Sequence, residues 1–164
     1  MKTYLLREHE TFAFKPPLGL PGGILYVGPN LWIADGELVI RGRWEWDGNS
    51  FKLSLGPFIF GVADGPLMRN GEPAGKWPSA GHDIMYERIR DLARVCNCSV
   101  WKIRKAADVW FRDEWLRRLN DVENGRVRRC WRLRVLLEYY PAVRALGWIL
   151  VMRRLATRER YIVL

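Results

Sequence analysis

Cysteine and histidine are scarce in this sequence, with three cysteines and two histidines among 164 residues. An odd number of cysteines gives no even disulfide framework, and Cys96 and Cys98 lack the second cysteine pair that a structural zinc site needs. We therefore expect reduced thiols in a protein made in the cytosol. One of the two histidines, His82, stands beside a carboxylate at the start of a predicted helix, and acid–base chemistry is expected there.

Long apolar runs are also missing. Residues 1–8 contain no apolar stretch of signal-peptide length, so the sequence predicts no signal peptide and no Sec-dependent export. The most apolar late stretch, residues 145–152, is far too short for a membrane span and is flanked by arginines. We expect no transmembrane segment.

Proline and glycine are scarce after His82, since eight of nine prolines and 13 of 15 glycines precede it. These residues interrupt helices and favour short strands and turns. The sequence therefore predicts an α+β fold: a small antiparallel β region with hairpins in residues 1–78, followed by an Arg-rich bundle of about four helices in residues 79–164. A chain of this length is typical of a single domain, here 1–164.

The clearest strand signal is an apolar run on each side of Asp35-Gly36, which predicts a tight hairpin over Leu31–Ile40. Turn-forming residues mark Lys15–Gly23 as a loop and predict a long irregular segment over Gly61–Pro78, of the kind that often covers a site. Further strands are predicted at Ile24–Val27, Arg43–Trp46, Phe51–Leu55 and Phe58–Phe60.

Serines mark two helix starts. Ser79 is the predicted N-cap of a first helix that ends near Cys96, and Ser99 is that of a second helix that ends near Asn120. Pro141 is expected to end a third helix, because proline cannot continue the hydrogen-bond ladder. The third and fourth helices are predicted over Arg126–Tyr140 and from Ala142 to about Ala156.

Excess positive charge is confined to the helical half. Residues 1–81 contain 8 Lys+Arg and 8 Asp+Glu, which leaves 19 and 10, and thus the whole net charge of +9, to residues 82–164. Such a surface favours an anionic partner: nucleic acid, an acidic lipid or lipopolysaccharide surface, or an acidic neighbour in an assembly. The alternative is a solvated helical surface that uses arginine.

The densest basic stretch is 126–134, in which Trp131 stands among arginines. It predicts binding to phosphates or to a membrane surface, although such a run is often only the solvated face of an amphipathic helix. No base-reading motif accompanies it, so nucleic-acid binding would be non-specific. The predicted contacts to an anionic partner are Arg126, Arg128, Arg129 and Arg132.

Helical spacing gathers several polar residues at the centre of the predicted bundle. His82 and Tyr86 fall on the apolar side of the first helix, with Asp83 at its edge. Asp108 lies on or beside the apolar stripe of the second helix, where a buried carboxylate needs a partner. Arg144 is the one charge in an otherwise apolar stretch and is also expected to be paired.

Three arrangements of these residues are compatible with the sequence. In the first, His82 is a general base held by Asp108 or Tyr86, while Asp83 turns outward to hold a hard cation; adjacent helical side chains diverge, so this histidine and Asp83 are not expected to bond. In the second, the histidine and the two aspartates share one divalent metal such as calcium, with Asp47 from a turn as a further ligand. In the third, the histidine is a core residue satisfied by a buried aspartate that joins two helices.

Four short motifs between Trp44 and Trp148 carry a family resemblance. They are Trp44 to Asp47-Gly48-Asn49-Ser50, His82-Asp83-Ile84-Met85-Tyr86, Arg104-Lys105-Ala106-Ala107-Asp108-Val109-Trp110-Phe111 and Val143-Arg144-Ala145-Leu146-Gly147. In order and spacing the chain resembles the phage- and prophage-encoded family catalogued as domain of unknown function thirteen-fifty-three. The resemblance implies a phage origin and a shared pocket, but no particular reaction.

From this resemblance we expect a bacteriophage-encoded, virion-associated or morphogenesis protein, with a place at the tail. Its expected partners are other phage structural proteins. It would be made in the host cytoplasm and then become part of the virion.

The His-Asp-x-x-Tyr helix and a later helical aspartate are also similar to the dyad of secreted type A-two phospholipases. In those enzymes the histidine is the base, its neighbour binds calcium and the distant aspartate orients the histidine. This likeness implies an alternative function, a metal-assisted ester or phosphoester hydrolase of the host envelope, with His82, Asp83 and Asp108 in these roles. Non-specific nucleic-acid binding through the basic half is a third candidate.

Overall fold

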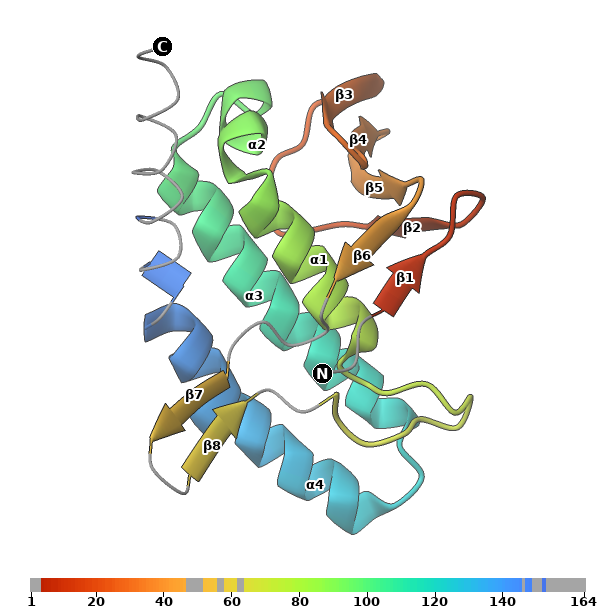
Figure 1. Ribbon diagram of the computed structural model, residues 1–164, viewed down its shortest axis with the longest axis vertical. Coiled ribbons are helices and arrows are strands. Elements are labelled where there is room, and N and C mark those ends of the chain that lie inside the picture. Colours follow the sequence, from red (N-terminus) through yellow and green to blue (C-terminus); the bar gives the residue numbers. More distant parts are fainter. Residues whose placement is uncertain are drawn as a thin grey trace.

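The protein is an α+β chain with its strands before its helices, as the sequence predicts (Figure 1). The computed structural model describes residues 4–46, 52–55, 58–61, 64–145, 147, 148 and 152, of which 52–55 and 58–61 are described as backbone only.

The strands form three small antiparallel sheets. In the largest sheet the strand order is β2-β5-β4-β3, while β1 pairs with β6 and β7 pairs with β8. The strands are β1 (Tyr4–Leu6), β2 (Thr11–Phe14), β3 (Ile24–Gly28), β4 (Leu31–Ala34), β5 (Glu37–Arg41), β6 (Trp44–Trp46), β7 (Lys52–Leu55) and β8 (Phe58–Gly61).

The predicted hairpin over Leu31–Ile40 is confirmed as β4 and β5. Its two turn residues have positive φ angles, 51° at Asp35 and 81° at Gly36, which is the backbone of the tight turn that suits the twist of paired strands. The sequence did not predict β1 and β2. They are only three and four residues long, and their partners β6 and β5 lie far along the chain, so no local turn signal marks them.

The helical half contains α1 (Lys76–Glu87), α2 (Ile89–Val95), α3 (Val100–Arg118), the 3-10 turn η1 (Leu119–Asp121), α4 (Gly125–Arg134) and the π-helical segment η2 (Val135–Tyr139). Ser99 caps α3 as predicted, because its side chain accepts a hydrogen bond from the backbone N–H of Lys102. Ser79 was wrongly predicted as a cap. The helix begins earlier, at Lys76, and the buried Ser79 hydroxyl donates to the Lys76 carbonyl and accepts from Trp46 Nε1.

The prediction that Pro141 ends a helix is also wrong. The chain stays helical from η2 through Ala145. In the π turn before the proline, the N–H of Tyr140 donates to the carbonyl of Val135, five residues back. This wider turn accommodates a residue that has no N–H and whose ring clashes with the carbonyl four positions earlier in an ordinary α-helix. Most of the predicted fourth helix, beyond Ala145, lies outside the described residues.

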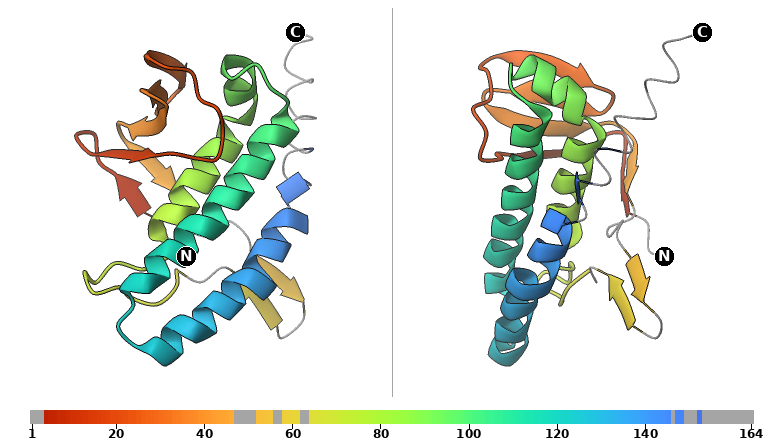
Figure 2. Two further views of the ribbon diagram at one scale, coloured as in Figure 1. Left: turned by 180° about the vertical axis from the view of Figure 1, so that it is seen from behind. Right: turned by 90° about the vertical axis from the view of Figure 1, so that its left-hand side faces the viewer.

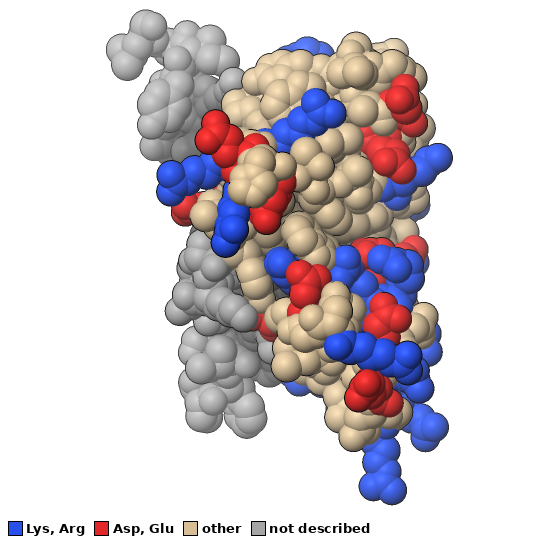
Figure 3. Space-filling model, turned by 90° about the vertical axis from the view of Figure 1, so that its right-hand side faces the viewer, with Lys and Arg blue, Asp and Glu red and all other residues tan. Residues whose placement is uncertain are grey.

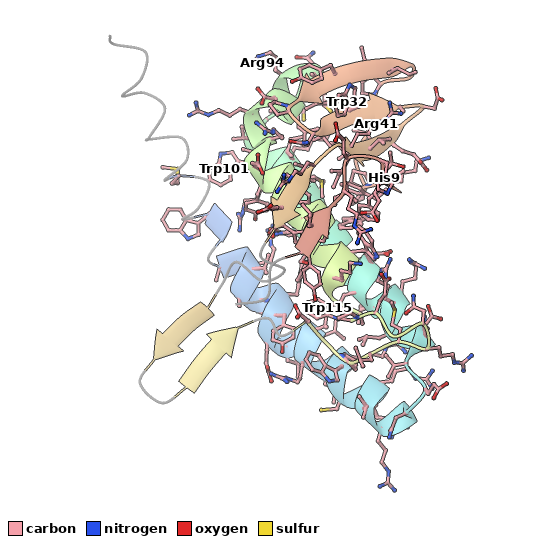
Figure 4. The ribbon with its side chains drawn as sticks, turned by 45° about the vertical axis from the view of Figure 1, so that its right-hand side comes forward. His9, Trp32, Arg41, Arg94, Trp101 and Trp115 are labelled. Carbon is pink, nitrogen blue, oxygen red and sulfur yellow. The ribbon has the colours of Figure 1, made fainter. Side chains whose placement is uncertain are left out.

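The helices α1 and α3 run side by side, with the four-stranded sheet toward one end of the pair and α4 toward the other (Figures 1 and 2). One apolar core lies where the sheet packs on the first three helices and includes Ile33, Ile84 and Ile103. A second core lies between α3, α4 and the loop before α1. Trp115 is fully buried in it, with its ring 5.3 Å from that of Tyr139 (Figure 4).

In the described part of the chain we find no helix with the length and apolar character of a membrane span.

Candidate functional site

The residues predicted to share a site meet around Asp108, whose side chain is 0% exposed. Tyr86 Oη donates a 2.6 Å hydrogen bond to Asp108 Oδ1, and His82 Nε2 lies 3.4 Å from the same oxygen. On the other side, Arg144 Nη1 donates to Asp108 Oδ2 at 3.0 Å, and Arg104 Nε lies 3.8 Å from that oxygen. We call these five residues and Asp83 the Asp108 cluster.

Three helical segments supply the Asp108 cluster. His82 and Tyr86 are four residues apart on α1, so they share a face, and their ring centres are 4.3 Å apart. Arg104 stands four residues before Asp108 on α3, so these two residues also share a helix face. Arg144 comes from the helical turn after Pro141, and a guanidinium nitrogen of Arg104 donates to its backbone carbonyl.

Glycine lets this third segment approach α1. A Cβ atom at Gly147 would overlap the hydroxyl oxygen of Tyr86. The closing Val-Arg-x-x-Gly motif therefore places two residues at the Asp108 cluster: an arginine that neutralises Asp108 and a glycine that leaves room for Tyr86.

His82 is held between two carboxylates. Its Nε2 faces Asp108, and its Nδ1 lies 3.4 Å from Asp83 Oδ1. The prediction that adjacent helical residues do not meet is wrong here. Because Nδ1 is the ring nitrogen nearer the backbone, it stays beside α1 and reaches the next residue, while Nε2 points across to α3.

The electrostatic surroundings favour a charged histidine. Burial lowers the pKa of His82, but its hydrogen bonds to Asp108 and Asp83 raise it more, so the net shift is upward. A protonated imidazole donates from both nitrogens, which matches two carboxylate neighbours. Burial and the adjacent Asp108 carboxylate raise the pKa of Tyr86, so that its phenol stays neutral and donates.

The Asp108 cluster is closed at its centre and opens only at its margin. The side chains of His82 and Asp83 are 12% and 21% exposed, and that of Arg144 is 37% exposed. The carboxylate at the centre has no contact with solvent. The arrangement can hold charge and fix three helical segments, and it reaches solvent through the histidine edge and Arg144.

A metal centre is not assembled by the described residues. Among residues 4–46 and 64–145 and the other described positions, no group of three or more His, Cys, Asp or Glu side chains could hold a metal ion. In the structure the Asp83 and Asp108 carboxylates face opposite ring nitrogens of His82, so these three side chains do not converge on one point. Asp47, the further predicted ligand, lies outside the described residues, and a calcium site that includes it stays a prediction.

The predicted anion-binding arginines lie apart from the Asp108 cluster, along α4. They line an open hollow of about 980 Å³. Its lining residues are Asn120, Asn124, Gly125, Arg126, Arg128, Arg129 and Arg132. The sequence thus points to two separate places, a buried polar cluster and an open basic surface.

Arg104 was missed as a site residue. The available signal was its position four residues before a carboxylate on the apolar stripe of α3.

Comparisons of the chain with protein-family models, with curated proteins and with solved structures found no match. The resemblance to the phage family therefore stays a prediction from its motifs.

Proposed function

We propose that the chain is a bacteriophage-encoded component of the virion or of its assembly, with a place at the tail, and that the Asp108 cluster serves its architecture. The motifs behind the family resemblance include His82, Asp108 and Arg144, and these three residues lie together in space. That convergence supports the view that the motifs describe one structural unit.

The observation that carries the non-catalytic role is the complete engagement of Asp108. Each of its oxygens faces donors, and none of its surface reaches solvent. His82 has a carboxylate at each nitrogen, so neither nitrogen is placed to take a proton from water. Buried ionic groups held in this way fix the relative positions of the elements that carry them.

The test is made on the phage that encodes the chain. We expect mass spectrometry of purified particles to detect the protein, or a deletion of its gene to yield defective particles that the intact gene restores. Absence from the virion together with normal particles from the deletion mutant would exclude this proposal.

A hydrolase is a second candidate, favoured by one observation: Nε2 of His82 faces Asp108, as the phospholipase-like dyad requires. In that role Asp108 orients His82, which takes a proton from water through Nδ1. Asp83 would have to leave Nδ1 and face the substrate, where it and Asp47 would hold a cation that polarises the scissile bond.

The hydrolase role is tested with ester and phospholipid substrates, with and without calcium. It requires that His82→Ala and Asp83→Asn abolish turnover, whereas His9→Ala, which changes the other, exposed histidine, leaves it intact. No turnover by the native chain, or equal turnover by all variants, assigns the Asp108 cluster to structure alone.

A further inference from the structure

Four arginines distributed along α4 line the open hollow, and the lining contains no carboxylate. Arg126, Arg129 and Arg132 are exposed, while Arg128 is partly buried and donates to the backbone carbonyl of Asn120. At about 100° per residue, the four positions fall within about 160° of the helix circumference. Figure 3 shows Lys and Arg gathered toward the lower end of the molecule on one face, with some acidic side chains between them.

These arginines differ from their neighbours in having no carboxylate partner among the described residues. Nearby, Arg117 and Arg118 pair with Glu114, and Arg134 pairs with Glu138. In the described part of the chain no Asp or Glu oxygen lies within 4.0 Å of the guanidinium groups that line the hollow. Their charge is left available to an external anion.

We propose that this arginine hollow binds the phosphodiester backbone of a nucleic acid, without regard to base sequence. Arginine presents a planar fork of donors that matches phosphate oxygens. The start of α4 adds the positive end of its helix dipole. The Asn124 side chain already accepts from the backbone N–H groups of Arg126 and Val127, the second and third residues of α4, so the guanidinium groups make most of the contacts.

The composition of the hollow favours a nucleic acid over a bilayer. Its lining is arginine, asparagine and glycine, with no apolar side chain to enter a membrane. Exposed leucines do occur nearby, at Leu133 in α4 and at Leu136 and Leu137 in η2. They come after the arginines in the chain and do not line the hollow. A phosphate backbone is a row of charges that a row of arginines can follow along α4.

The experiment measures binding of the full chain to a 20-base-pair DNA duplex of arbitrary sequence as salt concentration is varied. Three or four phosphate contacts predict a slope of log K against log salt of about −2.7 to −3.6, which is about a 40- to 150-fold loss of affinity between 50 and 200 mM salt. The variant Arg126→Gln/Arg129→Gln/Arg132→Gln is expected to reduce the slope by about 3. A second duplex of different sequence is expected to bind equally well.

The matched control removes the same charge elsewhere. Lys15→Gln/Lys102→Gln/Lys105→Gln changes three exposed lysines that do not line the hollow, and is expected to leave the slope unchanged. If the triple variant does not fold, Arg129→Gln alone replaces it. This single variant is expected to make the slope shallower by about 1. Absence of DNA binding, equal loss in both triple variants, or binding to anionic vesicles but not to DNA would each overturn the proposal. None of these outcomes bears on the virion proposal.

Discussion

At the scale of single residues, the Asp108 cluster surrounds one buried carboxylate with side chains from three helical segments. Asp108 on the apolar stripe of α3 and Arg144 in an apolar stretch each require a partner. In the structure these two residues pair with each other. Arg104 was missed because an arginine in a charged helix is ordinary, although its position four residues before Asp108 was an available signal. The Nδ1 contact of His82 was also unpredictable, since it depends on a side-chain rotation that helical spacing does not fix.

Asp108 is expected to be the most costly charge to remove. Asp108→Asn leaves Arg104, Arg144 and His82 without their common counter-charge in a buried site, and we expect it to lower the free energy of unfolding by about 3–5 kcal/mol. Urea denaturation measures this loss. Asp113→Asn, on the exposed side of the same helix, is the control and should cost no more than about 1 kcal/mol. Equal losses would mean that the buried cluster does not contribute as proposed.

His82 makes stability depend on pH with a definite sign. Its pKa is raised in the folded chain, so the folded state holds the proton more tightly than the unfolded state. The resulting stabilisation is complete below the ordinary histidine pKa of about 6.5 and is lost as pH rises through the raised pKa.

We therefore expect the difference in free energy of unfolding between the native chain and His82→Gln to shrink as pH rises above the ordinary histidine pKa of about 6.5 and through the raised pKa of His82. Denaturation at a series of pH values measures the difference, and subtraction removes the titration of other groups. His9→Gln, which changes the exposed histidine of the chain, is the control variant. A difference that grows with pH would show that the folded state favours neutral His82.

At the scale of elements, sequence signals located the helices and strands better than their ends. Ser99 lies at a helix start and caps it, whereas Ser79 has the same chemistry and is a buried residue inside α1 that bonds to Trp46. Pro141 ends helices in general, yet the π turn of η2 carries the helix past it. The error at Ser79 comes from packing against a distant strand, which a short-range pattern does not contain. The error at Pro141 comes from a local change of hydrogen-bond spacing that residue preferences do not reveal.

The contact between α1 and α3 depends on Gly81. A Cβ atom there would overlap the six-membered ring of Trp110 on α3. Alanine normally stabilises a helix relative to glycine, by about 1 kcal/mol. Here Gly81→Ala is expected to lower the free energy of unfolding by about 1–3 kcal/mol, because the two helices must separate.

Thermal denaturation compares Gly81→Ala with Gly125→Ala. The first turn of α4 has room for a Cβ at Gly125, whose nearest neighbour would be an Arg128 nitrogen at 3.8 Å. We expect Gly125→Ala to be neutral or stabilising. A stabilised Gly81→Ala variant would mean that α1 and α3 are not in close contact at this point.

At the scale of the whole molecule, the composition of the two halves foretold the α+β class but not how the halves are joined. The join is α3, which contributes Ile103 and Ala107 to the core under the sheet and Trp115 to the core against α4. Because one continuous helix supplies both cores, loss of order in one removes packing surface from the other. A helix shared by both cores is the arrangement expected if residues 1–164 form a single domain.

If the two cores form one domain, they unfold together. Leu31→Ala opens a cavity in the first core and Trp115→Ala one in the second, since both side chains are 0% exposed, and each is expected to cost about 2–5 kcal/mol. Urea unfolding is followed by far-ultraviolet circular dichroism and by tryptophan fluorescence. In each variant the two probes should report the same, lowered transition midpoint, because a cooperative domain has one unfolding transition. The prediction fails if the two probes report separate transitions and each variant lowers only the midpoint of the core that it changes. The protein would then consist of two units that α3 connects and that unfold independently.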